Sequence, residues 1–153
     1  MEGNVSLSGP DSLLPYGRRF LFVKEIRPID SVPPRLVAVH DDRGGGGINA
    51  DHFRNLQVYP GAFILEGCAQ AAVCLYSTRV RRLRRGEVPL LAHSKARFLA
   101  TVREATGLIH VVELIKASGR NAVFRGTSKK DAVIIMECEL GLAVRSGKHL
   151  KFT

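Results

Sequence analysis

Alternating apolar and polar positions predict six β-strands, two before and four after one long apolar stretch. Pro33-Pro34 interrupts the pattern between the first two strands, because proline pairs break regular structure. The segments 118–120 and 128–131 are rich in turn residues and separate the later strands. The predicted strands span residues 20–26, 35–40, 90–100, 108–117, 121–128 and 132–145.

The apolar stretch GAFILEGCAQAAVCLYSTRVRRL, which follows Pro60, predicts one long helix. Proline suits the start of a helix, and alanine, leucine and glutamine suit its interior. The first four turns are apolar on nearly every side, which predicts a helix that is buried all round. The sequence becomes polar only at Ser77-Thr78.

The order of elements predicts an α+β hot-dog fold. Two strands, one long helix and four strands follow one another, and a helix that is apolar all round needs a structure wrapped about it. A curved antiparallel sheet around a buried central helix meets this need. Residues 1–12 are polar and contain glycine and proline, so we expect a flexible N-terminal arm. Residues 13–153 then form a single domain.

Composition limits the class of protein. A chain of 153 residues with 45% apolar residues fits one globular domain. The apolar stretch contains Glu66 and Gln70 and is shorter than a membrane span, and the N-terminus lacks the features of a signal peptide. Three cysteines, an odd number in apolar surroundings, favour buried free thiols in a reducing compartment. We therefore expect a cytoplasmic protein.

A net charge of +9 suggests an acidic partner. The charge is concentrated in the run Arg79-Val80-Arg81-Arg82-Leu83-Arg84-Arg85. One interpretation is a solvated helix end, where cations complement the helix dipole. The other is a docking surface for an acidic macromolecule. No aromatic residues alternate with the arginines, which argues against nucleic acid.

Two polar residues interrupt the predicted buried helix. Glu66 and Gln70 are four residues apart and therefore share one helix face. Burying an unpaired carboxylate costs several kcal/mol, so Glu66 must be paired, protonated or functional. It could bond Gln70 or a core arginine and serve only packing. Alternatively, burial could raise its pKa and make it a general acid near neutral pH.

His52 lies in the predicted loop before the helix, fourteen residues before Glu66. Alone, it could be an ordinary polar loop residue. Together, an imidazole and a protonated carboxyl supply the base and the acid that a 1,2-elimination of water needs. Gly61 at the helix N-terminus offers a backbone N–H, with the helix dipole behind it, to the oxygen of a developing enolate.

The segment from His52 to Gln70, HFRNLQVYPGAFILEGCAQ, resembles a motif of the FabZ-type 3-hydroxyacyl-[acyl-carrier-protein] dehydratases. That family motif reads HFPGxPxxPGxxxxEAxAQ, and His–Phe, Pro–Gly, Glu and Ala–Gln are kept here without insertion or deletion. Further matches are Leu14-Pro15, Phe20-Leu21, the segment 95–98 (KARF) and the segment 124–126 (FRG). The resemblance covers roughly residues 13–145.

The resemblance implies a role for each matched residue. His52 is the base, Glu66 the acid, and the Gly61 N–H the donor to the thioester oxygen. It implies a substrate site lined by Phe53, Tyr59, Pro60, Gln70 and Phe98. It further implies a hot-dog dimer, in which His52 of one subunit faces Glu66 of the other, with higher oligomers possible. Neither a metal nor a separate cofactor is expected, because the phosphopantetheine arm arrives on the carrier protein. Carrier proteins are acidic, and the expected docking residues are Arg79, Arg81, Arg82, Arg84 and Arg85.

Several positions differ from the family pattern. Tyr16 stands where the family usually has His, and we interpret this position as structural. Arg54-Asn55 replaces Pro-Gly, Gln57 replaces Pro, and the segment 104–106 (EAT) replaces a Pro-Gly-Asp turn. These changes suggest a specialised homologue, such as a polyketide-pathway dehydratase or one subunit of a heterodimer. Three functions therefore stay open: an active dehydratase, a hot-dog acyl thioesterase, and a non-catalytic or half-active partner subunit.

Overall fold

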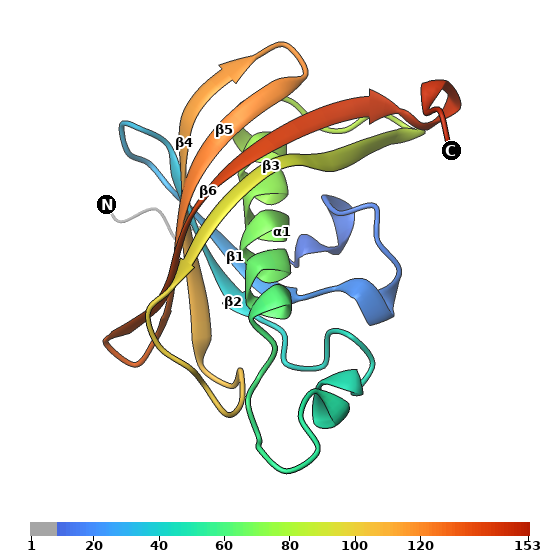
Figure 1. Ribbon diagram of the computed structural model, residues 1–153. Helices are drawn as coiled ribbons and strands as arrows, with labels where there is room; N and C mark the ends of the chain where they lie inside the picture. The colour runs from blue at the N-terminus through green and yellow to red at the C-terminus, as the bar shows by residue number, and fades with distance from the viewer. Residues whose placement is uncertain (1–8) are drawn as a thin grey trace.

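The computed structural model describes residues 9–153, and its six strands form one antiparallel sheet around one long helix (Figure 1). The strand order in the sheet is β1-β2-β4-β5-β6-β3, and every neighbouring pair is antiparallel. The strands are β1 (Val23–Ile29), β2 (Arg35–His40), β3 (Glu87–Phe98), β4 (Leu108–Ser118), β5 (Asn121–Lys130) and β6 (Val133–Ser146). The helix α1 spans Gly61–Arg79. The predicted hot-dog fold and order of elements are confirmed.

Helix α1 crosses the inner face of the curved sheet (Figure 1). It begins directly after Pro60, as the sequence predicts. Eleven of its nineteen residues are buried, and an unbroken buried run extends from residue 70 to residue 77. The largest core side chains that surround it come from the sheet and from the segment before β1; they include Phe22, Leu36, Leu108, Phe124, Met136 and Leu140.

The first strand begins later than the sequence predicts. Residues Arg18–Phe20 form the short 3₁₀ helix η2, and β1 begins at Val23 instead of Phe20. The reason is a tertiary contact from α1. The Gln70 side chain accepts a hydrogen bond from the Phe22 N–H and donates one to the Phe20 carbonyl. These backbone groups are therefore not available to a sheet ladder.

The N-terminal arm lies mostly outside the described residues, because the structure describes nothing before residue 9. Pro10–Ser12, at the end of the predicted arm, form the 3₁₀ helix η1, and Pro10 is buried. These residues therefore belong to the folded unit. Two more 3₁₀ helices, η3 (Ile48–Asp51) and η4 (Gly147–His149), lie in the β2–α1 loop and after β6.

Strand β3 is an open edge of the sheet, since β6 is its only neighbour in the strand order. Residues 90–99 are all exposed, and four of them are large and apolar: Leu90, Leu91, Phe98 and Leu99. A long apolar edge strand is a ready surface for pairing with another chain.

Two further predictions concern cysteines and membranes. All three cysteines are buried free thiols, as predicted, and the Cys68 and Cys138 sulfurs lie 3.7 Å apart without a bond. Within residues 9–153, the structure contains no helix with the length and apolar character needed to cross a membrane.

Candidate active site

Glu66 lies on α1, half-buried, at the wall of a partly open cavity of about 190 Å³. Burial raises the pKa of its carboxyl group, while a hydrogen bond from Gln70 opposes this rise. The net direction is upward, so the carboxyl holds its proton at higher pH than an exposed glutamate does. The Gln70 amide contacts only Oε1, at 3.0 Å. Glu66 can therefore donate a proton into the cavity.

Gln70 fixes Glu66 in place. Its amide oxygen accepts from the Phe22 N–H at 2.9 Å, and its amide nitrogen donates to the Phe20 carbonyl at 2.7 Å and to Glu66. Gln70, expected in the substrate site, has no exposed surface in the structure, and its side chain holds the Glu66 carboxyl group in place.

The cavity beside Glu66 is mostly apolar. Its walls come from α1, β3, β5 and β6, and they include Val73, Leu90, Leu91, Phe124, Leu140 and Leu142. Tyr16 and Phe20 close it on the side of the N-terminal segment. Such a lining suits a hydrocarbon chain and keeps the carboxyl group in a poorly solvated environment.

Tyr16 is a candidate site residue that the sequence analysis assigned to structure alone. It lines the cavity together with Glu66, and burial, followed by the nearby Glu66 carboxylate, raises the pKa of its phenol to about 12. The hydroxyl is therefore neutral near pH 7 and can donate a hydrogen bond. The available signal was its position in the family motif, where a histidine is usual.

His52 lies in the exposed loop between η3 and α1. Its Nδ1 is 3.0 Å from the Val58 carbonyl oxygen, which can only accept a hydrogen bond. Nδ1 therefore carries the hydrogen, and Nε2 keeps the lone pair that a base needs. Phe53 packs on the imidazole with ring centroids 4.3 Å apart. Within one chain His52 lies outside the cavity that Glu66 lines.

Gly61 is the first residue of α1, so its N–H has no carbonyl partner within the helix. The Phe98 ring covers it closely, since a β-carbon at position 61 would lie 2.9 Å from that ring. Pro60 is buried at the helix start. Tyr59, expected in the substrate site, is also buried, and its hydroxyl bonds to His40 at 2.8 Å.

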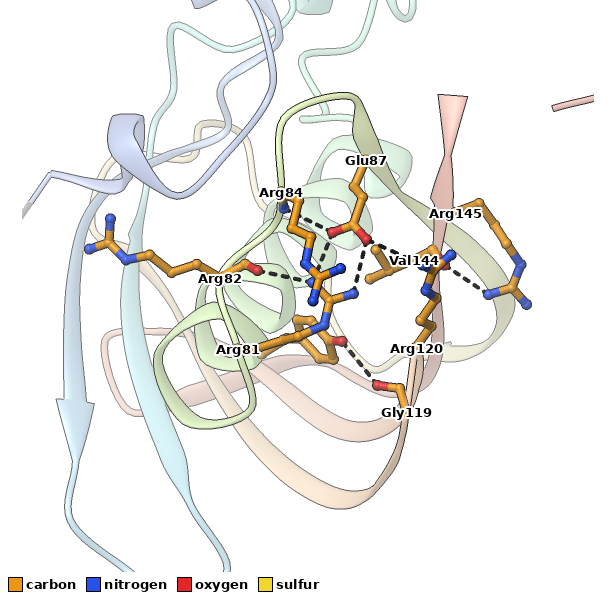
Figure 2. Close-up of polar contacts among 9 residues, drawn as sticks. Arg81, Arg82, Arg84, Glu87, Gly119, Arg120, Val144 and Arg145 are labelled. Atoms are coloured by element: carbon orange, nitrogen blue, oxygen red, sulfur yellow. Dashed lines mark hydrogen bonds and ion pairs between the residues drawn. The ribbon is translucent and has the colours of Figure 1, made fainter. Parts of the chain in front are cut away.

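Two members of the arginine run, Arg79 and Arg81, bond to other parts of the protein through their side chains. Arg79 is the last residue of α1 and donates to the Ile29 carbonyl, whereas the other four arginines follow in the loop before β3. Arg81 forms a two-point ion pair with Glu87, at 2.8 and 3.1 Å. Figure 2 shows Arg81 and Arg120 directed at the Glu87 carboxylate, while Arg82 extends away from it. The first interpretation, cations that complement the helix dipole, can apply only to Arg79, because the other arginines of the run lie beyond the end of α1.

Glu87 is a residue that the sequence analysis missed. Hydrogen bonds from the Arg81 side chain and the Arg84 backbone N–H lower its pKa to about 2. Its side chain is 6% exposed, so the ion pair is enclosed, and we interpret it as a clamp on the loop. The clamp also explains why β3 begins at Glu87, three residues before the predicted start.

His40 and His110 form a buried pair under α1 that the sequence analysis also missed. His40 Nδ1 lies 2.9 Å from His110 Nε2, and the exposed fractions of the two residues are 1% and 0%. Strand alternation offered a signal: each histidine continues the inward-facing side of its strand, after Leu36 and Ala38 in β2 and after Leu108 in β4.

A carboxyl group at the wall of an apolar cavity, on a helix inside a curved antiparallel sheet, is the arrangement that the comparisons with known proteins can be set against. Residues 47–139 match the family model of the FabA-like domain. That match covers more than half of the chain, and the chain belongs to this family. The enzyme is a dehydratase, because relatives of that class align over nearly its whole length.

Curated relatives named 3-hydroxyacyl-[acyl-carrier-protein] dehydratase FabZ support this assignment. The protein from Pectobacterium atrosepticum is 35% identical over 134 residues, which cover 87% of this chain and 88% of the relative. The Vibrio atlanticus protein is 31% identical, and the alignment covers 94% of this chain and 96% of the relative. The Thermotoga petrophila protein is 30% identical, and the alignment covers 88% of this chain and 93% of the relative.

Solved structures confirm the fold at lower identity. The dehydratase heterocomplex ApeI:P from Xenorhabdus doucetiae superposes with a TM-score of 0.68 at 16% identity, covering 94% of this chain and 95% of the other. A mutant of the fluoroacetyl-CoA-specific thioesterase FlK gives a TM-score of 0.55 at 18% identity, covering 62% and 68%. The fold is thus shared by dehydratases and thioesterases.

Proposed function

We propose that this dehydratase removes water from a 3-hydroxyacyl thioester carried on an acyl carrier protein and releases a trans-2-enoyl thioester, in fatty-acid or polyketide biosynthesis. The single observation that carries the proposal is Glu66, a carboxyl group whose pKa is raised by burial at the wall of an apolar cavity. The named activity of the relatives supports the same substrate class. The phosphopantetheine arm belongs to the substrate, so the reaction requires no further cofactor.

The proposed reaction is an elimination by His52 and Glu66. His52 Nε2 takes the proton from the carbon next to the thioester carbonyl, because Nδ1 already donates to Val58. The electron pair moves onto the carbonyl oxygen, where the Gly61 N–H stabilises it. It then forms the carbon–carbon double bond as the hydroxyl group leaves, and Glu66 protonates that hydroxyl to give water. Exchange of one proton with solvent resets the pair.

We propose that two copies complete each site. Within one chain His52 lies outside the cavity of Glu66, and the apolar wall at Leu90 and Leu91 belongs to the open edge strand β3. Pairing along β3 would cover this edge and bring the loop of one subunit to the cavity of the other. The partner is a second copy or a related hot-dog subunit, and the heterocomplex among the structural neighbours supports the latter arrangement.

The first test replaces the acid and the base. His52→Ala and Glu66→Gln should each reduce dehydration of a 3-hydroxyacyl carrier protein by roughly 10²–10⁴-fold. His149→Ala and Glu137→Gln are the matched controls, since both residues are exposed and remote from the cavity. Full activity in either site variant contradicts its role. An inactive wild type that gains activity with a related subunit identifies the heterodimer.

Mixing the two inactive variants tests whether the sites are shared. If His52 and Glu66 come from different subunits, a mixed dimer has one intact site and one doubly altered site. After random exchange about half of the dimers are mixed, so about a quarter of the wild-type activity should return. A site within one chain predicts no recovery.

We further propose that the exposed arginines Arg82, Arg84 and Arg85 dock the acidic carrier protein. Arg81 is paired with Glu87 and holds the loop, and Arg79 bonds the Ile29 carbonyl from the end of α1. Replacing the three exposed arginines with alanine should raise KM for the carrier-bound substrate and reduce its dependence on salt.

The control for docking removes the same charge elsewhere, from the exposed residues Arg27, Lys148 and Lys151. If both triple variants raise KM equally, net charge attracts the carrier protein and the arginine loop has no specific role.

A further inference from the structure

A continuous chain of hydrogen bonds runs through the core beneath α1. The Tyr59 hydroxyl lies 2.8 Å from His40 Nε2, His40 Nδ1 lies 2.9 Å from His110 Nε2, and His110 Nδ1 lies 2.7 Å from Ser128 Oγ. All four residues are at most 3% exposed. Burial lowers the pKa of both histidines, so each ring is neutral and carries one N–H.

The hydrogens in this chain can point in one consistent direction. A neutral imidazole donates from one nitrogen and accepts at the other. If Tyr59 donates to His40, then His40 donates to His110 and His110 donates to Ser128. This direction gives the Tyr59 hydroxyl and both imidazole N–H groups an acceptor, as a stable buried network needs.

The absence of a side chain at Gly67 of α1 leaves space for the His40 and His110 rings of this hydrogen-bond chain. A β-carbon there would lie 2.5 Å from His40 Nδ1 and 2.6 Å from His110 Nε2. The FabZ-type motif has alanine at this position. The glycine here therefore leaves space for the two imidazoles that the β-carbon of an alanine would occupy.

At its Tyr59 end, the chain of hydrogen bonds reaches the peptide that orients His52. The carbonyl of the Val58–Tyr59 peptide accepts from His52 Nδ1 at 3.0 Å. The N–H of the same peptide donates to the Val102 carbonyl at 2.8 Å. The Tyr59 side chain is then held by His40, between the rings of His40 and Phe63. One peptide plane is thus fixed by its backbone N–H and by the side chain that follows it.

We propose that Tyr59, anchored by the buried His40–His110–Ser128 chain, is a positioning residue that fixes the orientation and tautomer of His52. The inference rests on the proposed role of His52 as the base. The loop 54–57 lacks the proline and glycine residues of the family motif, and the anchor at Tyr59 supplies rigidity immediately after it. Tyr59 acts through the Val58 carbonyl.

The test is Tyr59→Phe, which removes one hydroxyl and keeps the ring. Because a small misplacement of a catalytic group lowers the rate strongly, kcat should fall roughly ten- to hundredfold with KM nearly unchanged. Tyr76→Phe is the matched control: Tyr76 is also buried, but its hydroxyl bonds to the Gly119 carbonyl, and the residue neither lines the cavity nor belongs to the His40–His110–Ser128 chain. That variant should lose stability and keep kcat. Equal effects of the two variants on kcat would overturn the proposal.

A measurement independent of activity is ¹⁵N NMR of the labelled imidazoles at about pH 8, where an ordinary imidazole is neutral. His52 should show a single Nδ1–H tautomer in the wild type and in Tyr76→Phe, and a second tautomer should appear in Tyr59→Phe. An unchanged His52 spectrum in Tyr59→Phe would show that the network does not hold the ring.

A double-mutant cycle separates this inference from the proposed mechanism. If Tyr59 acts only through His52, Tyr59→Phe should have no further effect on the rate in a His52→Ala background. A full additional loss in that background would overturn the positioning role. If His52→Ala alone keeps full activity, the mechanism is wrong, whereas the NMR result still decides whether Tyr59 orients the ring.

Discussion

Replacing Gly67 with alanine tests the packing of α1 on the buried histidine pair. The added β-carbon would lie 2.5 Å from His40 Nδ1 and 2.6 Å from His110 Nε2. Both distances are well inside van der Waals contact, and the rings have no exposed side toward which they could move. The methyl group therefore either displaces a ring or separates the two hydrogen-bonded nitrogens.

The expected loss follows from three contributions. Overpacking a dense core costs about 1–3 kcal/mol. Stranding a buried N–H without its acceptor costs about 1–3 kcal/mol more. Alanine is the better helix former by about 1 kcal/mol, which offsets part of this. We expect Gly67→Ala to lower the free energy of unfolding by about 3 kcal/mol, seen as a lower urea midpoint with an unchanged m-value at equal protein concentration.

The same substitution should behave differently when one ring is absent. In a His110→Ala background, His40 can move into the vacated space, so Gly67→Ala should be neutral or should stabilise by up to about 1 kcal/mol. A stabilisation of that size in the wild type would refute the reasoning, because it would mean that the imidazoles do not occupy the space beside Gly67.

Three further predictions concern assembly, pH and the arginine loop. Leu91→Glu on the β3 edge should yield monomers in native mass spectrometry and abolish dehydration, while Val32→Glu, in the exposed β1–β2 turn, should do neither. His40 has a pKa lowered to about 4, so its stabilising contribution is complete above an unfolded pKa of about 6.5 and is lost as pH falls toward 4. The buried His110, whose pKa is also lowered, adds to the stability lost from pH 7 to 5, so urea unfolding of His40→Gln should show a loss that is smaller than in the wild type by about 2 kcal/mol. An equal loss in both proteins would exclude His40 as the titrating group. Glu87→Gln should speed trypsin cleavage of the arginine-rich loop 80–86 roughly tenfold, whereas Glu137→Gln, at an exposed position, should leave the cleavage rate unchanged. Equal cleavage rates in the two variants would contradict the role of Glu87 as a clamp.

The fold was predictable because its strongest signals are local. A helix that is apolar on every side has one economical environment, and the alternation in the later strands matches their observed bounds within a few residues. The displaced start of β1 was not predictable, because the cause is Gln70, some fifty residues away, which binds backbone groups at Phe20 and Phe22. The local pattern predicted the strand correctly, but a tertiary contact moved its start from Phe20 to Val23.

The candidate site was predictable only in part. Glu66 was identifiable because a carboxylate on an apolar helix requires an explanation, and His52 was identifiable from a spaced motif. The two histidines of the buried network are seventy residues apart, and strand register alone brings them together. Nor does composition show which arginine of a run is paired; the position of Glu87 at the start of β3 selects Arg81.

The proposed acid and the proposed base are held by different means, and this difference supports the proposal that a partner completes the site at His52. Glu66 sits on a rigid helix, with its pKa and its orientation set by burial and by Gln70 within the same chain. His52 is exposed on a loop, and the apolar residues Phe53 and Leu56 of the same loop are 53% and 60% exposed. Exposed apolar residues around a catalytic imidazole are costly in water and favourable in an interface. Pairing along β3 would cover these side chains and exclude water from His52. The same pairing would bring His52 of one subunit to the cavity of Glu66 in the other. Assembly and activity should therefore be lost together.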